Sequence, residues 1–333
     1  LYVLSELPVI VIILAATATV TAAILTAVSG LALPLAATSV GLIAVAGVML
    51  RVGGYGLLER LTKVFVAILT LATLTATVLS LPRIDWSPAA WAPPAMDPAT
   101  LAFVVALMGF MPSAINLSVL QSLWAMRRRQ RDGEHASASA ALLDFNVGYI
   151  GSGVLAICFV LMGAGVMHAS GEAPAASAGV FAGQIIGLFT TTIGDWAGLV
   201  VGVAALLVMF TTLMTVLDGF PRMLATAFAV LRDGPDAGDA GRASRLTLCM
   251  GLYGVAASIV LLFLMGSFRD FIDFVTITAF VVGPIAATLN HLAMCASHVP
   301  AASRPPRWLQ AWSIAGIVAM LVLTAVFFGG RTG

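Results

Sequence analysis

Long apolar runs alternate along the chain with short polar stretches. About 20 consecutive apolar residues suffice for an α-helix to cross the hydrocarbon core of a membrane, and by this measure the pattern predicts about nine transmembrane helices. Their expected positions are 7–50 for the first two, with a turn at Ser29, Gly30 and Pro34, then 64–82, 98–126, 145–171, 196–217, 246–268, 274–296 and 308–330. The stretch 177–193 carries Gln184 and three threonines, which favours an interfacial or partly re-entrant segment.

Composition and charge agree with a membrane protein. Apolar residues make up 60% of the 333 positions and charged residues only 9%, against about 25% in a soluble domain. With alternating spans, 13 of the 16 basic residues fall on one side, and basic loops stay in the cytoplasm. We therefore expect one polytopic, all-α transmembrane domain over 1–333 in a bacterial inner membrane, with cytoplasmic loops near 127–141 and 233–245.

The predicted helix 98–126 contains two helix breakers, Gly109 and Pro112. Proline lacks a backbone N–H and clashes with the preceding turn, and glycine lowers helix stability, so we expect a broken helix near 109–113. Unwound backbone at this depth is tolerated where protein or a cavity surrounds it, and secondary transporters use it to hold ions. Met108 and Met111 offer soft thioethers and Asn116 a hard oxygen. The alternative is a simple kink with methionine packing.

The other buried polar groups are few. Asp144 and Asn146 belong either to a transport pathway or to the N-cap of the helix 145–171. Asp218 is a transport residue or the carboxylate at the entrance of a loop, and Asn290 and His291 form a pair near the inner membrane edge. The sequence contains no phosphate-binding glycine loop, paired-histidine metalloprotease helix or Gly-x-Ser-x-Gly elbow. We therefore expect no enzyme and no cofactor.

Four segments together resemble a known family. Met-Gly-Phe-Met-Pro at 108–112, followed by Asn-Leu-Ser and Gln-Ser-Leu-Trp, resembles the sixth-helix motif of the Nramp divalent metal transporters, and is most similar to their divergent prokaryotic branch. Segments 55–60, 144–149 and 215–222 agree with that family in the same order. The resemblance implies a leucine-transporter-type inverted-repeat fold, in which this chain supplies the third to eleventh helices and lacks the first two.

The resemblance also implies roles for single residues. Met111 stands at the family's metal-binding methionine, and Met108 at the residue whose backbone carbonyl binds the ion. Ser113 replaces the usual histidine, while Ile13 and Ala16 lie about where other members carry acidic residues of the proton path. These three departures argue against proton coupling by the family's usual route.

Together these observations predict a secondary transporter that moves a divalent metal cation, manganese or iron, by alternating access. Its expected partners are the cation and the lipid bilayer, with no nucleic acid, and its expected form is a monomer. Two alternatives remain open: a symporter of the same fold that carries an amino acid or another small solute, and a membrane scaffold subunit without transport activity.

Overall fold

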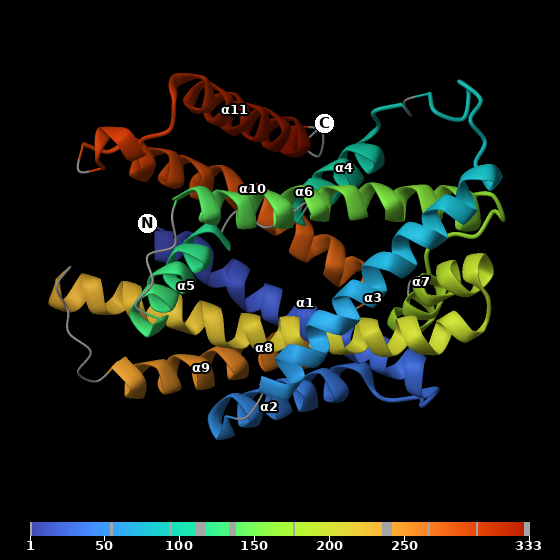
Figure 1. Cartoon of the computed structure of the whole chain (residues 1–333), viewed down its shortest axis with the longest axis horizontal. Coiled ribbons are helices and arrows are strands. Elements are labelled where there is room, and N and C mark those ends of the chain that lie inside the picture. Colours follow the sequence, from blue (N-terminus) through green and yellow to red (C-terminus); the bar gives the residue numbers. More distant parts are fainter. Residues whose placement is uncertain are drawn as a thin grey trace. The chain divides into compact units, whose positions relative to one another are not determined.

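The computed structural model describes residues 2–53, 56–92, 95–110, 117–132, 138–175, 177–234, 242–264, 267–297 and 299–329, and every regular element in these ranges is helical (Figure 1). The α-helices are α1 (Tyr2–Ser29), α2 (Leu35–Val52), α3 (Gly56–Ser80), α4 (Pro98–Phe110), α5 (Leu117–Asp132), α6 (Ala138–Met162), α7 (Ala178–Ile193), α8 (Trp196–Asp233), α9 (Arg242–Ile259), α10 (Phe268–Cys295) and α11 (Arg307–Gly329). Short 3-10 turns lie at Leu81–Arg83 and Ala301–Ser303, and π-helical turns extend α6 over Gly163–His168 and α9 over Val260–Leu264.

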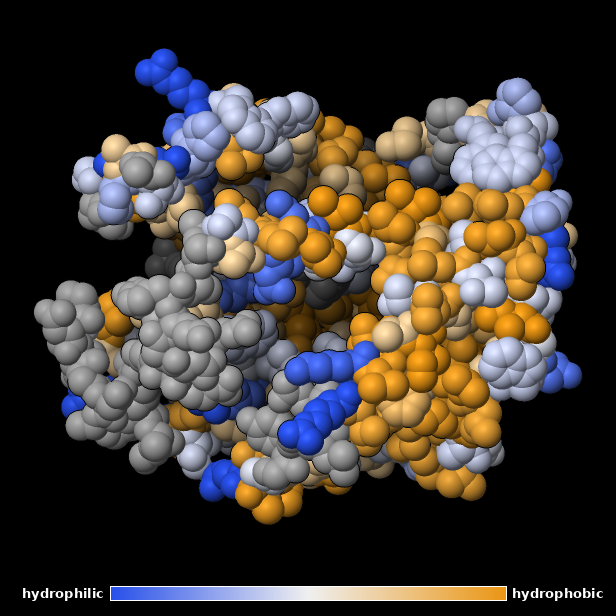
Figure 2. All heavy atoms as spheres, viewed as in Figure 1, coloured by the Kyte–Doolittle hydropathy of each residue, from blue (hydrophilic) through white to orange (hydrophobic). Residues whose placement is uncertain are grey.

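Eight helices in the described ranges are long and apolar enough to cross a membrane: α1, α2, α3, α6, α8, α9, α10 and α11. The prediction of an all-helical, multi-pass membrane protein is confirmed at this level. Apolar side chains cover large continuous areas of the surface seen in Figure 2, and exposed α3 residues such as Leu71 and Val78 are of this kind. Such a surface suits lipid, because soluble monomers rarely expose apolar patches of this extent.

Three segments differ from the nine-span prediction. The span expected at 98–126 is described as two shorter helices, α4 and α5, which flank residues 111–116. The helix α8 does not end at Leu217 but continues to Asp233, so it has 38 residues and is about 57 Å long. The segment expected to be interfacial forms the 16-residue helix α7.

The predicted turn between the first two helices is confirmed. The helix α1 ends at Ser29, and Gly30 follows with φ +68°, a left-handed conformation that glycine adopts without steric cost. Pro34 directly precedes α2. The two predicted cytoplasmic loops are narrower than expected, because α5 continues to Asp132 and α6 begins at Ala138. The second loop is bounded by the end of α8 at Asp233 and the start of α9 at Arg242.

The chain, predicted as one transmembrane domain, forms two compact units. The larger unit comprises residues 10–92 and 138–272, and in it α8 packs against α2, α3, α7 and α9. Its core includes a cluster from α3, α6, α7 and α8, formed by Ala76, Met162, Leu188, Phe189, Ala197 and Val201.

The helix α1 is the most buried of the candidate spans, with 61% of its apolar window buried against at most 33% in the others. It is tied to α9 by the buried hydroxyl of Tyr253, which donates a hydrogen bond to the main-chain carbonyl of Ile10 at 2.7 Å. Both residues belong to the larger unit.

The smaller unit comprises residues 1–9, 93–137 and 273–333. In it α4 packs against α11, and both contribute to a buried apolar cluster with α10: Leu101 and Val105 from α4, Phe280 from α10 and Phe327 from α11. This cluster fixes the position of α4, the helix that ends in the sequence motif of the predicted ion site.

Candidate functional site

The predicted metal-binding segment is described only in part. Met108 and Gly109 lie in the last turn of α4, whereas Met111, Pro112, Ser113 and Asn116 lie outside the described residues. The side chain of Met108 is 42% exposed. The break expected near 109–113 and the roles of these four residues therefore stay predictions, and the structure gives the position of the helix end that precedes them.

Gly109 lies directly against the backbone of α10. A Cβ atom added to Gly109 would come to 2.1 Å from the main-chain oxygen of Thr276 and 2.9 Å from its carbonyl carbon. No other residue type fits at this position unless α4 and α10 separate. This contact explains the glycine by a close approach of two helix backbones, a use of small residues that is common in membrane helices. The sequence pattern predicts Gly109 as a helix breaker and gives no signal of this contact between distant positions.

The contact with Thr276 also indicates how deep the end of α4 lies. The helix α10 begins with a capping box, in which the Asp270 N–H donates to the Ser267 hydroxyl at 3.1 Å and that hydroxyl donates to the Asp270 carboxylate at 2.6 Å. Thr276 follows Phe268 by eight residues, a rise of about 12 Å. A hydrocarbon core is about 30 Å thick, so if α10 enters it at Phe268, a rise of about 12 Å corresponds to a position near its middle.

The opposite end of α4 is capped by a carboxylate. Asp97 precedes the helix, and its Oδ1 accepts a hydrogen bond from the backbone N–H of Thr100 at 2.7 Å. This backbone hydrogen bond, together with the side-chain hydrogen bond to Thr100, lowers the pKa of the Asp97 carboxyl below its ordinary value. The cap therefore stays charged at neutral pH, where it favours the positive N-terminal end of the helix dipole.

The sequence itself leaves one backbone acceptor in the motif without its usual partner. In an α-helix the carbonyl of residue i accepts from the N–H of residue i+4. For Met108 that residue is Pro112, which has no N–H. The carbonyl oxygen of Met108 therefore lacks its usual i+4 donor, and it lies in the same turn as Gly109, which packs against α10.

Asp144 and Asn146 do not form an N-cap. The helix α6 begins at Ala138, so both residues lie inside the helix, and both are exposed. Next to them, the rings of Phe145 and Tyr149 stack with their centres 5.3 Å apart. The N-cap interpretation is wrong because the small residues of 138–141 continue the helix rather than forming a loop.

Asp218 is not at the entrance of a loop. It lies within α8, where its carboxylate accepts a charge-assisted hydrogen bond from Nε of Arg222, one turn later, at 2.5 Å. Both side chains are partly buried. The guanidinium offsets the charge of Asp218, so this carboxylate is engaged within its own helix.

The described residues contain no group of three or more His, Cys, Asp or Glu side chains placed to hold a metal ion. The ligands predicted for the candidate site are main-chain carbonyls and the sulfur of Met111, which lies outside the described residues. Asp144, Asn146 and Asp218 belong to the larger unit, whereas Met108 and Gly109 belong to the smaller one.

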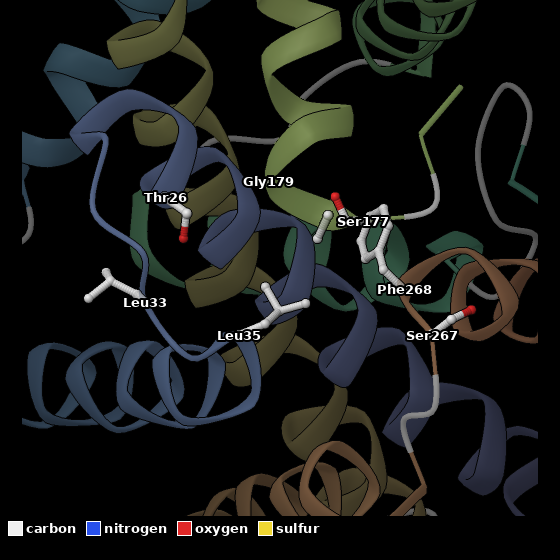
Figure 3. A pocket seen from close by; sticks show the side chains of 8 residues that line it. Thr26, Leu33, Leu35, Ser177, Gly179, Ser267 and Phe268 are labelled. Carbon is white, nitrogen blue, oxygen red and sulfur yellow. The ribbon is translucent and has the colours of Figure 1, made fainter. Parts of the chain in front are cut away.

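A pocket of about 460 Å³ lies elsewhere, within the larger unit (Figure 3). It is lined by Thr26, Leu33, Leu35, Ser177, Ala178, Gly179, Ser267 and Phe268. These residues come from the end of α1, the α1–α2 turn, and the starts of α2, α7 and α10. The Thr26 hydroxyl is buried and has no hydrogen-bond partner within the described part of the chain. The lining residues that the structure describes carry hydroxyl and apolar side chains.

These features define a class of protein: a multi-pass, all-helical membrane protein. No known family profile matches the chain. It is 30% identical over 321 residues to the Uncharacterized protein PM0681 of Pasteurella multocida strain Pm70, an alignment that covers 94% of this chain and 71% of the relative. The chain belongs to the same family as that bacterial protein.

Proposed function

We propose that this chain forms the transmembrane body of a secondary transporter that moves a divalent metal cation, manganese or iron, across a bacterial inner membrane by alternating access. The observation that supports the proposal is the close approach of Gly109 to the backbone of α10, next to the Met108 carbonyl, whose usual helical donor the sequence replaces with Pro112. A carbonyl oxygen that Pro112 leaves without a helical donor is available to a cation.

The dipole of α4 adds an electrostatic contribution that favours a cation at the C-terminal end of the helix. Its C-terminal end, at Gly109 and Phe110, is the negative end of the helix dipole, and this end attracts cations. Met111 would add a soft sulfur ligand two residues after Gly109, which favours manganese, iron and cadmium over magnesium and calcium. The Nramp-like order of motifs and the leucine-transporter-type inverted repeat belong to this proposal.

The pocket of Figure 3 favours a second candidate, a symporter of a small solute such as an amino acid. The hydroxyls of Thr26, Ser177 and Ser267 surround it together with apolar side chains, and the N-terminal ends of α7 and α10 meet there. Backbone N–H groups at helix N-termini suit a carboxylate. A metal cation would find no charged ligand in this pocket, so the two candidates use different sites.

The test compares two methionine variants of the full-length protein in proteoliposomes. Met111→Ala removes the proposed sulfur ligand, whereas Met108→Ala keeps its main-chain carbonyl and serves as the matched control. Competitive uptake of cadmium, manganese and calcium is measured and normalised to folded protein. Met111→Ala should lose cadmium uptake most, manganese less, and its discrimination against calcium should relax. Met108→Ala should keep the original ion preference.

A packing role for Met111 predicts a different result. Truncation of a well-packed methionine costs roughly 2–5 kcal/mol of stability without changing ion preference. If the uptake of all three ions falls in parallel with the folded fraction, the metal site is not at Met111. Uptake of an amino acid that Thr26→Val abolishes, without any metal uptake, would support the solute symporter instead.

A further inference from the structure

A polar cluster lies at the C-terminal end of α10, in the smaller unit, and the proposed transport site does not use it. The Nδ1 atom of His291 lies 3.0 Å from the hydroxyl oxygen of Ser313 in α11. One turn later on α10, the sulfur of Cys295 lies 3.8 Å from Nε2 of the same imidazole. Next to them, Nδ2 of Asn290 donates to the hydroxyl of Ser118 in α5 at 2.7 Å.

The distance between His291 and Cys295 matches one edge of a tetrahedral metal site. A zinc ion binds cysteine sulfur at about 2.3 Å and histidine nitrogen at about 2.0–2.1 Å, so two such ligands at the tetrahedral angle lie about 3.6 Å apart. The observed separation of Nε2 and Sγ is 3.8 Å. The two side chains therefore need almost no rearrangement to share one ion.

Ser313 orients the imidazole for this role. When Nδ1–H donates to the Ser313 hydroxyl oxygen, the lone pair of Nε2 points to the Cys295 sulfur. A histidine that binds a metal commonly has its second ring nitrogen held by such a partner, which fixes the tautomer and the ring orientation. Both His291 and Cys295 are partly exposed, so an ion can reach them.

We propose that His291 and Cys295 form a second metal site, which binds a soft divalent cation of the zinc or cadmium type. Imidazole and thiolate prefer these ions to magnesium, calcium and manganese. Binding displaces the thiol proton, which leaves as the metal–sulfur bond forms. Two protein ligands leave two coordination positions for water, so the ion exchanges readily. The proposal that an ion binds here depends on these residues alone. Only the idea that a transported cation passes through this site rests on the proposed function.

The test follows the reactivity of Cys295 in a protein with Cys158→Ala and Cys249→Ala. The rate of modification by N-ethylmaleimide is measured with and without cadmium. At about ten times the dissociation constant, about one tenth of the sites are free, so labelling should slow about tenfold. The same concentration of calcium should leave the rate unchanged. A thiolate-to-cadmium charge-transfer band, titrated in the ultraviolet, reports binding independently of how fast the thiol reacts.

His291→Gln is the decisive control, because it keeps a polar side chain but removes the ring nitrogen. Cadmium should no longer protect Cys295 in this variant, and Ser313→Ala should weaken cadmium affinity by about 10–100-fold. The proposal is wrong if cadmium neither protects Cys295 nor produces the band, or if His291→Gln is protected equally. Met111→Ala should leave the protection intact. Failure of the Cys295 protection test would therefore not count against the proposed transport site. Failure of the Met111 uptake test would likewise not count against the His291–Cys295 site.

Discussion

The backbone of Gly109 packs against the main-chain carbonyl of Thr276, so closely that a Cβ atom would lie 2.1 Å from the carbonyl oxygen. This contact joins the end of α4 to the interior of α10. It depends on the absence of a side chain at Gly109, and the Met108 carbonyl, which lacks its i+4 donor, belongs to the same turn. This packing contact therefore positions the helix end that precedes the predicted ion site.

Gly109→Ala should separate α4 from α10. Alanine is about 1 kcal/mol better than glycine inside a helix, but overpacking at a tight contact typically costs 1–3 kcal/mol, so a net loss of thermal stability is expected. Gly316→Ala is the matched control, since a Cβ atom there meets nothing within 4 Å, and it should leave the protein as stable or slightly more so. Thermal unfolding in detergent measures both. Equal stability of the two variants would contradict the close approach.

Pro112→Ala should give the main-chain carbonyl of Met108 its usual helical hydrogen-bond donor. It supplies the N–H that the Met108 carbonyl lacks, and alanine is about 3 kcal/mol better than proline in a helix interior. The variant should be more stable and transport manganese more slowly. Pro284→Ala in α10 makes the same chemical change away from the motif and should not slow transport. A Pro112→Ala protein that is more stable yet transports at the original rate would remove Met108 from the site.

The orientation of the chain can be read from cysteine labelling. Ala95 precedes α4 and Ala301 lies between α10 and α11, and both are exposed. The distribution of basic residues places Ala95 outside and Ala301 in the cytoplasm. With the three native cysteines replaced, a membrane-impermeant maleimide added to intact cells should label Ala95→Cys and spare Ala301→Cys. The reverse pattern would invert the predicted topology.

The helices were predictable because lipid imposes one simple rule. A segment that crosses the hydrocarbon must be apolar and must satisfy its backbone internally, so runs of apolar residues locate α1, α2, α3, α9, α10 and α11. The rule fails where polar residues are accommodated inside a helix. The helix that begins at 196 was expected to end at Leu217, before Asp218, but Asp218 pairs with Arg222 one turn later and α8 continues.

The candidate site was predictable only in its local part. Glycine and proline spacing identified the motif, and the missing N–H of Pro112 follows from the sequence alone. The approach of Gly109 to Thr276, and that of His291 to Ser313, join distant positions of the chain. Such contacts depend on how helices pack, which periodicity does not encode. The roles of Met111, Ser113 and Asn116 stay predictions.

The hydrogen bond from Tyr253 to Ile10 attaches α1 to α9 at one defined residue. Ile10 is the first residue of the larger unit, while residues 1–9 of the same helix belong to the smaller one. From Ile10 onward, α1 lies in the core of the larger unit, where Leu14, Ala15 and Ala18 are fully buried. A single phenolic hydroxyl, distant in the sequence, therefore anchors α1 at the residue where the larger unit begins.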